Sequence, residues 1–125
     1  MSLGSTRIVY LDDDEALVML ITRSLQRLGH QVTSFSDQDE ALRHIEADPL
    51  ALDVFVTDYN MPGMSGLDVA REVLKIRAGM PVLLISGYVT DALTHTAKQV
   101  GVRAVLEKPD GIAALTTGID AALKT

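Results

Sequence analysis

The sequence contains no cysteine and no tryptophan, few aromatic residues, and fewer basic than acidic side chains. Without cysteine the chain can form neither a disulfide framework nor a thiolate metal site. The net charge of −6 argues against binding to a phosphate backbone, because nucleic-acid binding needs clustered basic side chains. No apolar run approaches the ~20 residues that a membrane-spanning helix needs, and no secretory leader is visible. We therefore expect a cytoplasmic protein that binds neither nucleic acids nor membranes directly.

The chain does have enough apolar sequence for one compact domain. Hydrophobic residues make up 47% of its 125 residues and charged residues 22%, which is typical of a globular protein. We expect residues 1–6 to be a flexible leader or a remnant of expression cloning, and residues 7–125 to form the single domain.

Short apolar runs alternate five times with helical patterns. Three runs, VFVT, VLLI and AVL, are almost continuously apolar, as expected for strands that are covered on both faces. Repeated alternation of strands and helices predicts an α/β fold, a doubly wound parallel sheet with helices on both faces. The expected strands are Arg7–Leu11, Gln31–Phe35, Val54–Thr57, Val82–Ile85 and Ala104–Leu106.

Helix signals separate these strands. Ser36 in SDQD and Ser65 in SGLD each begin a capping-box pattern, which predicts a helix start. The last two helices are expected at about Thr90–Val100 and Ile112–Leu123. The first helix shows apolar spacing of a single helical face, which comprises Leu17, Leu20, Ile21, Ser24, Leu25 and Leu28.

Residues that directly follow the strands matter most, because ligands of such sheets bind beyond the carboxyl ends of the strands. An acidic run, Asp12 to Asp14, follows the first strand, and Asp58 follows the third. Ser86 follows the fourth strand, and Lys108 comes shortly after the fifth. We therefore expect carboxylates, a hydroxyl group and an amine to meet at one rim of the sheet.

The acidic run allows two interpretations. Carboxylates commonly cap helices, and Asp14 or Asp13 at the N-cap with Glu15 in the first turn would suit the helix dipole. Capping needs only one or two carboxylates, however, and Asp58 should approach the same rim. A hard divalent cation such as Mg²⁺, which prefers oxygen ligands, would compensate the repulsion. Asp12 and Asp13 are the expected metal ligands, with Asp14 facing the helix.

Asp58 stands in VTDYNMPGMSG, a segment rich in turn formers, so a simple turn aspartate is one interpretation. At the end of a buried strand its carboxylate could instead attack phosphorus and form an acyl phosphate. Lys108 could pair with Asp58 and then with the phosphoryl group, and Ser86 could donate its hydroxyl to a phosphoryl oxygen. A cis peptide bond before Pro109 would fix the direction of the lysine.

Four motifs in this order and spacing, LDDDEAL, VTDYNMPGMSGLDV, LLISGY and LEKP, resemble those of response-regulator receiver domains of bacterial two-component signalling, the CheY-like family. The resemblance covers Arg7 to Leu123. The segments LISGY and GVRAVLEKP are similar to those of receivers attached to hybrid histidine kinases. It implies a flavodoxin-like (βα)5 sheet with strand order 2-1-3-4-5. It also implies a signalling phosphoacceptor that catalyses only its own phosphorylation and dephosphorylation.

The resemblance implies a role for each matching residue. Asp58 matches the phosphoacceptor, which receives its phosphoryl group from a phosphohistidine of a histidine kinase or phosphotransfer domain. Asp12 and Asp13 match the acidic pair that binds Mg²⁺ together with Asp58 and the backbone carbonyl of Asn60. The implied partners also include a downstream effector domain or protein, and a phosphorylation-dependent homodimer.

The other matches concern the switch and the loops. Ser86 matches the switch hydroxyl that moves towards the phosphoryl group, and Lys108 matches the lysine before a cis proline, here Pro109. Pro62 and Gly66 match the turn that shapes the loop after the acceptor.

Two positions depart from the family pattern. Asp110 follows KP where the family prefers an apolar aromatic residue, and the second departure, at residue 105, concerns the switch. Val105 stands three residues before the lysine, where the family usually has tyrosine or phenylalanine, so the usual aromatic switch is missing. Tyr88 is a candidate replacement, and the alternative is that it is an ordinary surface tyrosine in a loop. This departure leaves open a degenerate receiver that acts as a phosphorylation-independent interaction module. A phosphatase of the haloacid-dehalogenase type also uses a strand-end aspartate with Mg²⁺, but it needs a second aspartate where this chain has Asn60.

Overall fold

The structure, a computed structural model, describes residues 6–108 and 111–124 of the chain. Residues 1–5 of the predicted leader and Pro109 lie outside the described residues, so the expectations for them stay predictions. None of the helices within the described ranges is long and apolar enough to cross a lipid bilayer.

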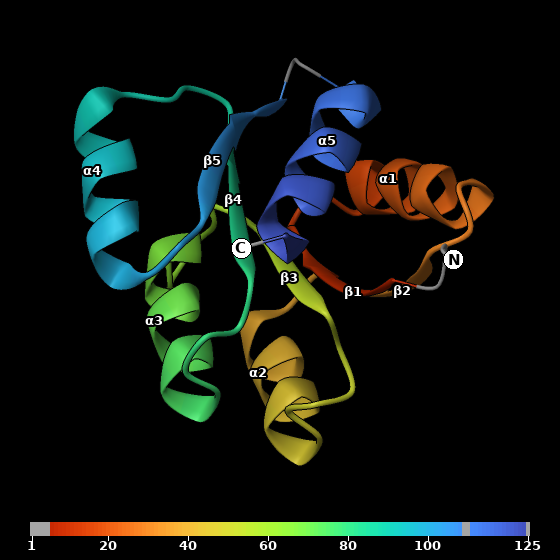
Figure 1. Cartoon of the computed structure of the whole chain (residues 1–125), viewed down its shortest axis with the longest axis horizontal. Helices are drawn as coiled ribbons and strands as arrows, with labels where there is room; N and C mark the ends of the chain where they lie inside the picture. Colours follow the sequence, from red (N-terminus) through yellow and green to blue (C-terminus); the bar gives the residue numbers. More distant parts are fainter. Residues whose placement is uncertain (1–5, 109–110, 125) are drawn as a thin grey trace.

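Strands and helices alternate along the described chain, as the sequence predicts (Figure 1). All strand pairs are parallel and their order is β2-β1-β3-β4-β5, which confirms the predicted doubly wound (βα)5 sheet. The strands are β1 (Arg7–Leu11), β2 (Gln31–Phe35), β3 (Val54–Asp58), β4 (Val82–Ser86) and β5 (Ala104–Glu107). The helices are α1 (Glu15–Arg27), α2 (Gln38–Ala47), α3 (Gly66–Ile76), α4 (Asp91–Val100) and α5 (Gly111–Leu123).

The sheet separates two apolar layers. Helices α1 and α5 cover one face, and α2, α3 and α4 cover the other (Figure 1). Side chains alternate between the layers along β1, where Ile8 and Tyr10 join the first layer and Val9 and Leu11 the second. Every residue of β3 and β4 is buried, which confirms that VFVT and VLLI are covered on both faces. The AVL segment of β5 also contacts both layers, with Val105 on one face and Ala104 and Leu106 on the other, but it is only half-buried because β5 is an edge strand.

Local capping explains where three of the helices begin. Asp14 is the N-cap of α1, as expected, and its side chain accepts a hydrogen bond from the backbone N–H of Leu17. Ser65 forms the predicted capping box of α3. The predicted start of α2 at Ser36 is wrong by one residue, because Asp37 is the N-cap and accepts from the N–H of Glu40.

The predicted apolar face of α1 is only partly buried. Leu25 is fully buried, but Leu20 is 61% exposed and Leu28 52% exposed. Val18, outside the predicted face, packs against the core instead. Leu20 lies along an apolar groove between α1 and α5, so the two helices leave part of the predicted face open.

Gly66 lets α3 begin directly against the end of β3. Its N–H donates to the carbonyl of Tyr59 over 2.8 Å. A Cβ atom built on Gly66 would lie 2.0 Å from the backbone carbonyl oxygen of Asp58 and 2.9 Å from a methyl carbon of Leu84. No side chain fits there, so this glycine sets the distance between α3 and the strand end that carries Asp58.

We predict that Gly66→Ala lowers the free energy of unfolding by at least about 2 kcal/mol, because the added methyl group must displace backbone atoms. Gly87→Ala is the matched control, since a Cβ at Gly87 meets no atom within 4 Å. Urea denaturation of both variants checks the prediction. Equal stabilities for the two variants would contradict the close packing inferred for Gly66.

Candidate functional site

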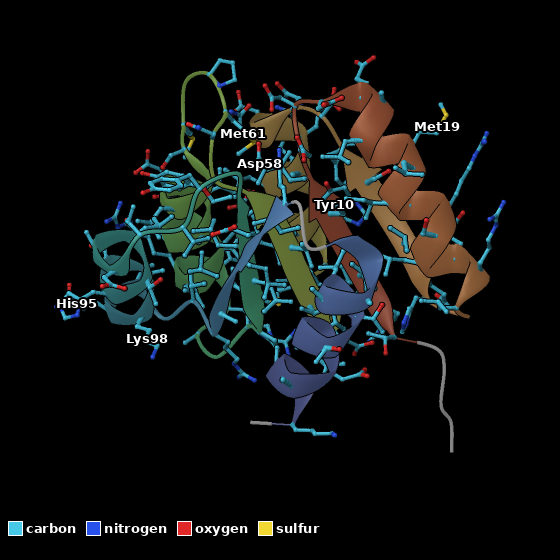
Figure 2. All side chains as sticks on the ribbon, turned by 90° about the horizontal axis from the view of Figure 1, so that it is seen from above. Tyr10, Met19, Asp58, Met61, His95 and Lys98 are labelled. Atoms are coloured by element: carbon cyan, nitrogen blue, oxygen red, sulfur yellow. The ribbon has the colours of Figure 1, made fainter. Side chains whose placement is uncertain are left out.

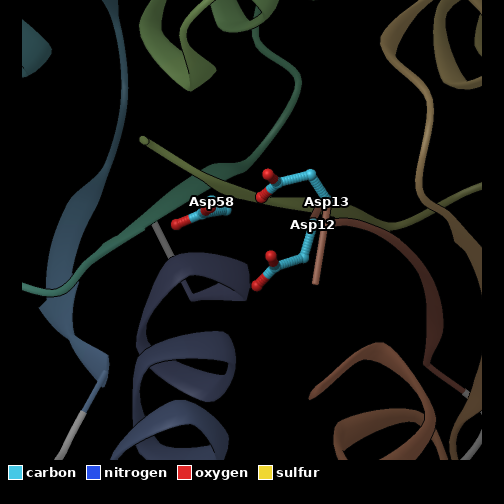
Figure 3. Close-up of side chains that lie close together, drawn as sticks. All are labelled: Asp12, Asp13 and Asp58. Carbon is cyan, nitrogen blue, oxygen red and sulfur yellow. The ribbon is translucent and has the colours of Figure 1, made fainter. Parts of the chain in front are cut away.

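The carboxyl ends of β1 and β3 bring three carboxylates together, as the sequence predicts (Figure 3). One oxygen each from Asp12, Asp13 and Asp58 lies within 4.8 Å of the other two. The parallel pairing of Leu11 with Thr57 explains the meeting, because Asp12 and Asp58 then follow at the same height of the sheet. Asp12 and Asp58 are buried and Asp13 is exposed, so the cluster has one side open to solvent.

Lys108 supplies the positive charge of this site. Its Nζ atom lies 3.1 Å from Oδ1 of Asp58 and 3.4 Å from Oδ2 of Asp12, and its side chain is 27% exposed. The predicted pair with Asp58 is therefore present, but the lysine is shared with Asp12. One ammonium group serves two buried carboxylates, which leaves excess negative charge at the rim.

Tyr10 is a member of this site that the sequence reasoning missed. Its hydroxyl donates to Oδ2 of Asp12 over 2.9 Å, while the N–H of Asp14 donates to Oδ1 over 3.0 Å. Figure 2 shows Tyr10 in the interior of the molecule. A signal existed, because residues i and i+2 of a strand point to the same face and Tyr10 precedes Asp12 by two.

Burial raises the pKa of Asp58 to about 6, and the nearby negative charge of Asp12 adds to the effect. The ammonium group of Lys108 and the backbone N–H of Asn60 act in the opposite direction but do not cancel it. For Lys108, burial would lower the pKa, yet the two carboxylates outweigh burial and the pKa is raised. Burial also raises the pKa of Tyr10, so its hydroxyl keeps the proton that it donates to Asp12.

The donor set fits a hard divalent cation. Neither oxygen of Asp58 receives a hydrogen bond of good geometry from the described residues, although Lys108 lies within ion-pair distance of one of them. Carboxylate oxygens are the ligands that Mg²⁺ prefers, and a cation would balance the excess charge. The three aspartates are the one such group of acidic, histidine or cysteine side chains found in the described chain. Asp12, Asp13 and Asp58 would hold the ion.

Ser86 and Tyr88 are tied to each other rather than to the carboxylates. Ser86 is 3% exposed, and its hydroxyl donates to the carbonyl of Tyr88 over 3.0 Å and accepts from the N–H of Tyr88. Tyr88 itself is 77% exposed, as expected of a surface loop residue. Val105 is half-buried and packs against the layer under α2, α3 and α4.

Gln38 holds the loop that follows Asp58. Its amide nitrogen donates to the carbonyl of Pro62 over 2.7 Å and to the carbonyl of Met64 over 3.1 Å. Asn60 lies exposed in the same loop. The sequence gives no local signal for this contact, because 24 and 26 residues separate the partners.

Known proteins resemble this chain over most of its length. A family profile described as "Response regulator receiver domain" matches residues 8–120. Over 109 residues the chain is 34% identical to the sensory/regulatory protein RpfC of Xanthomonas campestris pv. campestris, covering 84% of this chain but 15% of RpfC. It is 32% identical to the transcriptional regulatory protein GlrR of Escherichia coli, covering 99% of this chain and 28% of GlrR. The chain therefore spans only a small part of these relatives.

A solved structure shares the whole architecture. The response regulator receiver domain protein from Clostridium thermocellum superimposes with a TM-score of 0.89 at 29% identity. The match covers 95% of this chain and 94% of that one.

We predict that Asp58→Asn changes stability in a pH-dependent way when the metal is removed with EDTA. The pKa of Asp58 is about 6 in the folded state, above its ordinary 3.8, so ionisation destabilises the wild-type fold as pH rises from about 4 to about 6. Asparagine cannot ionise. Relative to wild type, the variant should gain about 2 to 3 kcal/mol of unfolding free energy between pH 4 and pH 7.5, measured by urea denaturation.

Asp53→Asn is the control for this measurement, with the opposite sign. Its hydrogen bond to Arg7 lowers the pKa of Asp53, so that carboxylate contributes stability above pH 4 and loses it as pH falls further. Asp53→Asn should therefore be less stable than wild type at pH 7.5. Parallel pH profiles for the two variants would contradict the assignment of the raised pKa to Asp58.

Proposed function

Because the chain belongs to the response regulator receiver domain family, we propose that Asp58 accepts a phosphoryl group from a phosphohistidine donor in a Mg²⁺-dependent reaction. Receiver domains are signalling modules, and the phosphoacceptor role in two-component signalling is the function of this family. The observation that carries the proposal is the buried Asp58 carboxylate, with two further carboxylates within 4.8 Å and an ammonium group at 3.1 Å.

The phosphoryl transfer forms one bond and breaks another. A carboxylate oxygen of Asp58 attacks phosphorus, the bond from phosphorus to the imidazole nitrogen breaks, and the imidazole keeps the electron pair. Mg²⁺, when bound, supplies charge stabilisation for the transferred phosphoryl oxygens. Lys108 is close enough to Asp58 to pair with the same group, because it already lies beside Oδ1. The chain itself thus positions the acceptor and catalyses its own phosphorylation.

A conformational signal would start from two contacts that phosphorylation changes. Lys108, now shared with Asp12, would turn towards the phosphoryl group, and the Ser86 hydroxyl would leave the backbone of Tyr88 to donate to a phosphoryl oxygen. The movement of Ser86 would displace the loop between β4 and α4, because Ser86 now bonds to Tyr88 of that loop. Val105 has no ring that could change position, so movement of this loop is the proposed output.

The proposed partners follow from this chemistry. A histidine kinase or phosphotransfer domain supplies the phosphohistidine, and a downstream effector domain or protein reads the altered loops. Relatives described as a sensory/regulatory protein and as a transcriptional regulatory protein are both compatible with such a role. We also propose that phosphorylation allows two copies of the chain to form a homodimer.

We predict that Asp58→Asn abolishes phosphorylation, because the amide is not a nucleophile towards phosphorus. The wild-type chain and the variant are incubated with acetyl phosphate and Mg²⁺, and the mass increase of one phosphoryl group is measured by intact-protein mass spectrometry. Asp53→Asn, a carboxylate at the opposite end of the sheet, should be labelled as wild type is. Labelling of the Asp58→Asn variant to wild-type level would refute the acceptor assignment.

The metal requirement gives a separate prediction. Excess EDTA should reduce the phosphorylation of the wild-type chain by at least about tenfold, since the phosphoryl charge then lacks its cation. Asp13→Asn should raise the Mg²⁺ concentration needed for half-maximal labelling, because it removes one charged ligand. Asp14→Asn is the neighbouring control, since Asp14 caps α1 and lies outside the three-carboxylate cluster. An equal shift in both variants would argue against a specific role for Asp13.

A further inference from the structure

Tyr10 lies completely inside the molecule, yet its one polar atom reaches the carboxylate cluster. The side chain is 0% exposed and sits in the apolar layer with Leu115 and Ile119 of α5. A hydroxyl group buried among apolar side chains costs free energy unless it forms a hydrogen bond. Its partner is Oδ2 of Asp12, at 2.9 Å. Packing alone would be satisfied by phenylalanine, so the hydroxyl calls for a separate explanation.

The contact with Tyr10 completes a set of restraints on Asp12. Oδ1 of this carboxylate accepts from the backbone N–H of Asp14 over 3.0 Å, and Oδ2 accepts from Tyr10. Lys108 approaches the same Oδ2 at 3.4 Å, farther than its 3.1 Å approach to Asp58. Each oxygen of Asp12 therefore has its own donor, and the plane of the carboxylate is fixed before any cation arrives.

We propose that Tyr10 is a positioning residue of the cation site: its hydroxyl fixes the orientation of Asp12, and through Asp12 the arrangement of carboxylates that receives Mg²⁺. The inference rests on the proposed function, in that it takes the cluster to bind Mg²⁺. Hydrogen-bond partners behind the ligands of a metal site typically change affinity by about 10- to 100-fold when they are removed. Tyr10 acts on the cation only through Asp12, and it does not touch the phosphoryl group.

The same hydroxyl links the site to one particular layer of the fold. Tyr10 packs under α1 and α5, whereas Val105 packs in the layer on the other face of the sheet. A shift of the Asp12 carboxylate on cation binding therefore reaches the α1 and α5 layer directly. The NMR resonance of Cζ, the ring carbon that carries the hydroxyl, should respond to that movement of Asp12.

The test is a Mg²⁺ titration of the full chain by isothermal titration calorimetry, without a phosphodonor. Tyr10→Phe should bind Mg²⁺ at least tenfold more weakly than wild type. Ile119→Val is the matched control, because it loosens the same apolar layer without altering a polar atom, and its affinity should equal that of wild type. Affinity of Tyr10→Phe within threefold of wild type would overturn the proposal, and so would an equal loss in Ile119→Val.

A double variant separates positioning from a general structural effect. If Tyr10 acts through Asp12, Tyr10→Phe has no further effect on Mg²⁺ affinity in a chain that already carries Asp12→Asn. A full additional tenfold loss in that background would overturn the proposal.

Should Tyr10→Phe fail to fold, the wild-type chain labelled with ¹³Cζ-tyrosine answers the same question. The Tyr10 resonance should shift on addition of MgCl₂, and an unchanged resonance in a chain that binds Mg²⁺ would overturn the role of Tyr10 alone. A wild-type chain without measurable Mg²⁺ affinity would overturn the proposed function as well. The two failures are therefore distinguishable.

Discussion

The balance of charge at the carboxyl ends of β1 and β3 governs the site. Asp12 and Asp58 are both buried, and a single ammonium group, that of Lys108, lies within reach of both. Burial removes water from the Asp58 carboxylate and the charge of Asp12 repels it, which is why the pKa of Asp58 rises to about 6. A bound cation would offset this repulsion.

Contacts between different elements of the fold hold the backbone around this site. Gly66 brings the first turn of α3 against the carbonyl of Asp58, Gln38 ties the following loop to α2, and Asp14 both caps α1 and steadies Asp12. By contrast, among the described residues the hydroxyl of Ser86 hydrogen-bonds only to the backbone of Tyr88, two residues away. The contacts around Asp58 therefore join different elements, whereas the hydroxyl of Ser86, which is proposed to move, has only local partners.

Val105 changes how such a site can signal. A valine in a half-buried edge strand has no ring to alternate between the core and the surface. Tyr10 links Asp12 to the layer under α1 and α5, and the proposed movement of Ser86 would link a phosphoryl group to the loop after β4. Since these links reach different helices, the structure permits a signal on the α1 and α5 side that does not depend on residue 105.

The sequence by itself determined the parallel sheet and the cluster of Asp12, Asp13, Asp58 and Lys108, while its resemblance to receiver domains implied the strand order. It could do so because parallel strands place whatever follows them at one rim, so position along the chain becomes position in space. Only the tertiary structure decided which side chains from different segments contact each other. Lys108 contacts Asp12 as well as Asp58, Tyr10 donates to Asp12, and Gln38 donates to the loop after Asp58. These depend on side-chain direction and on distances between segments far apart in the chain, which periodicity does not encode. For the same reason the sequence pattern did not predict the exposure of Leu20 or the partial burial of β5, since a pattern predicts an apolar face but not what covers it.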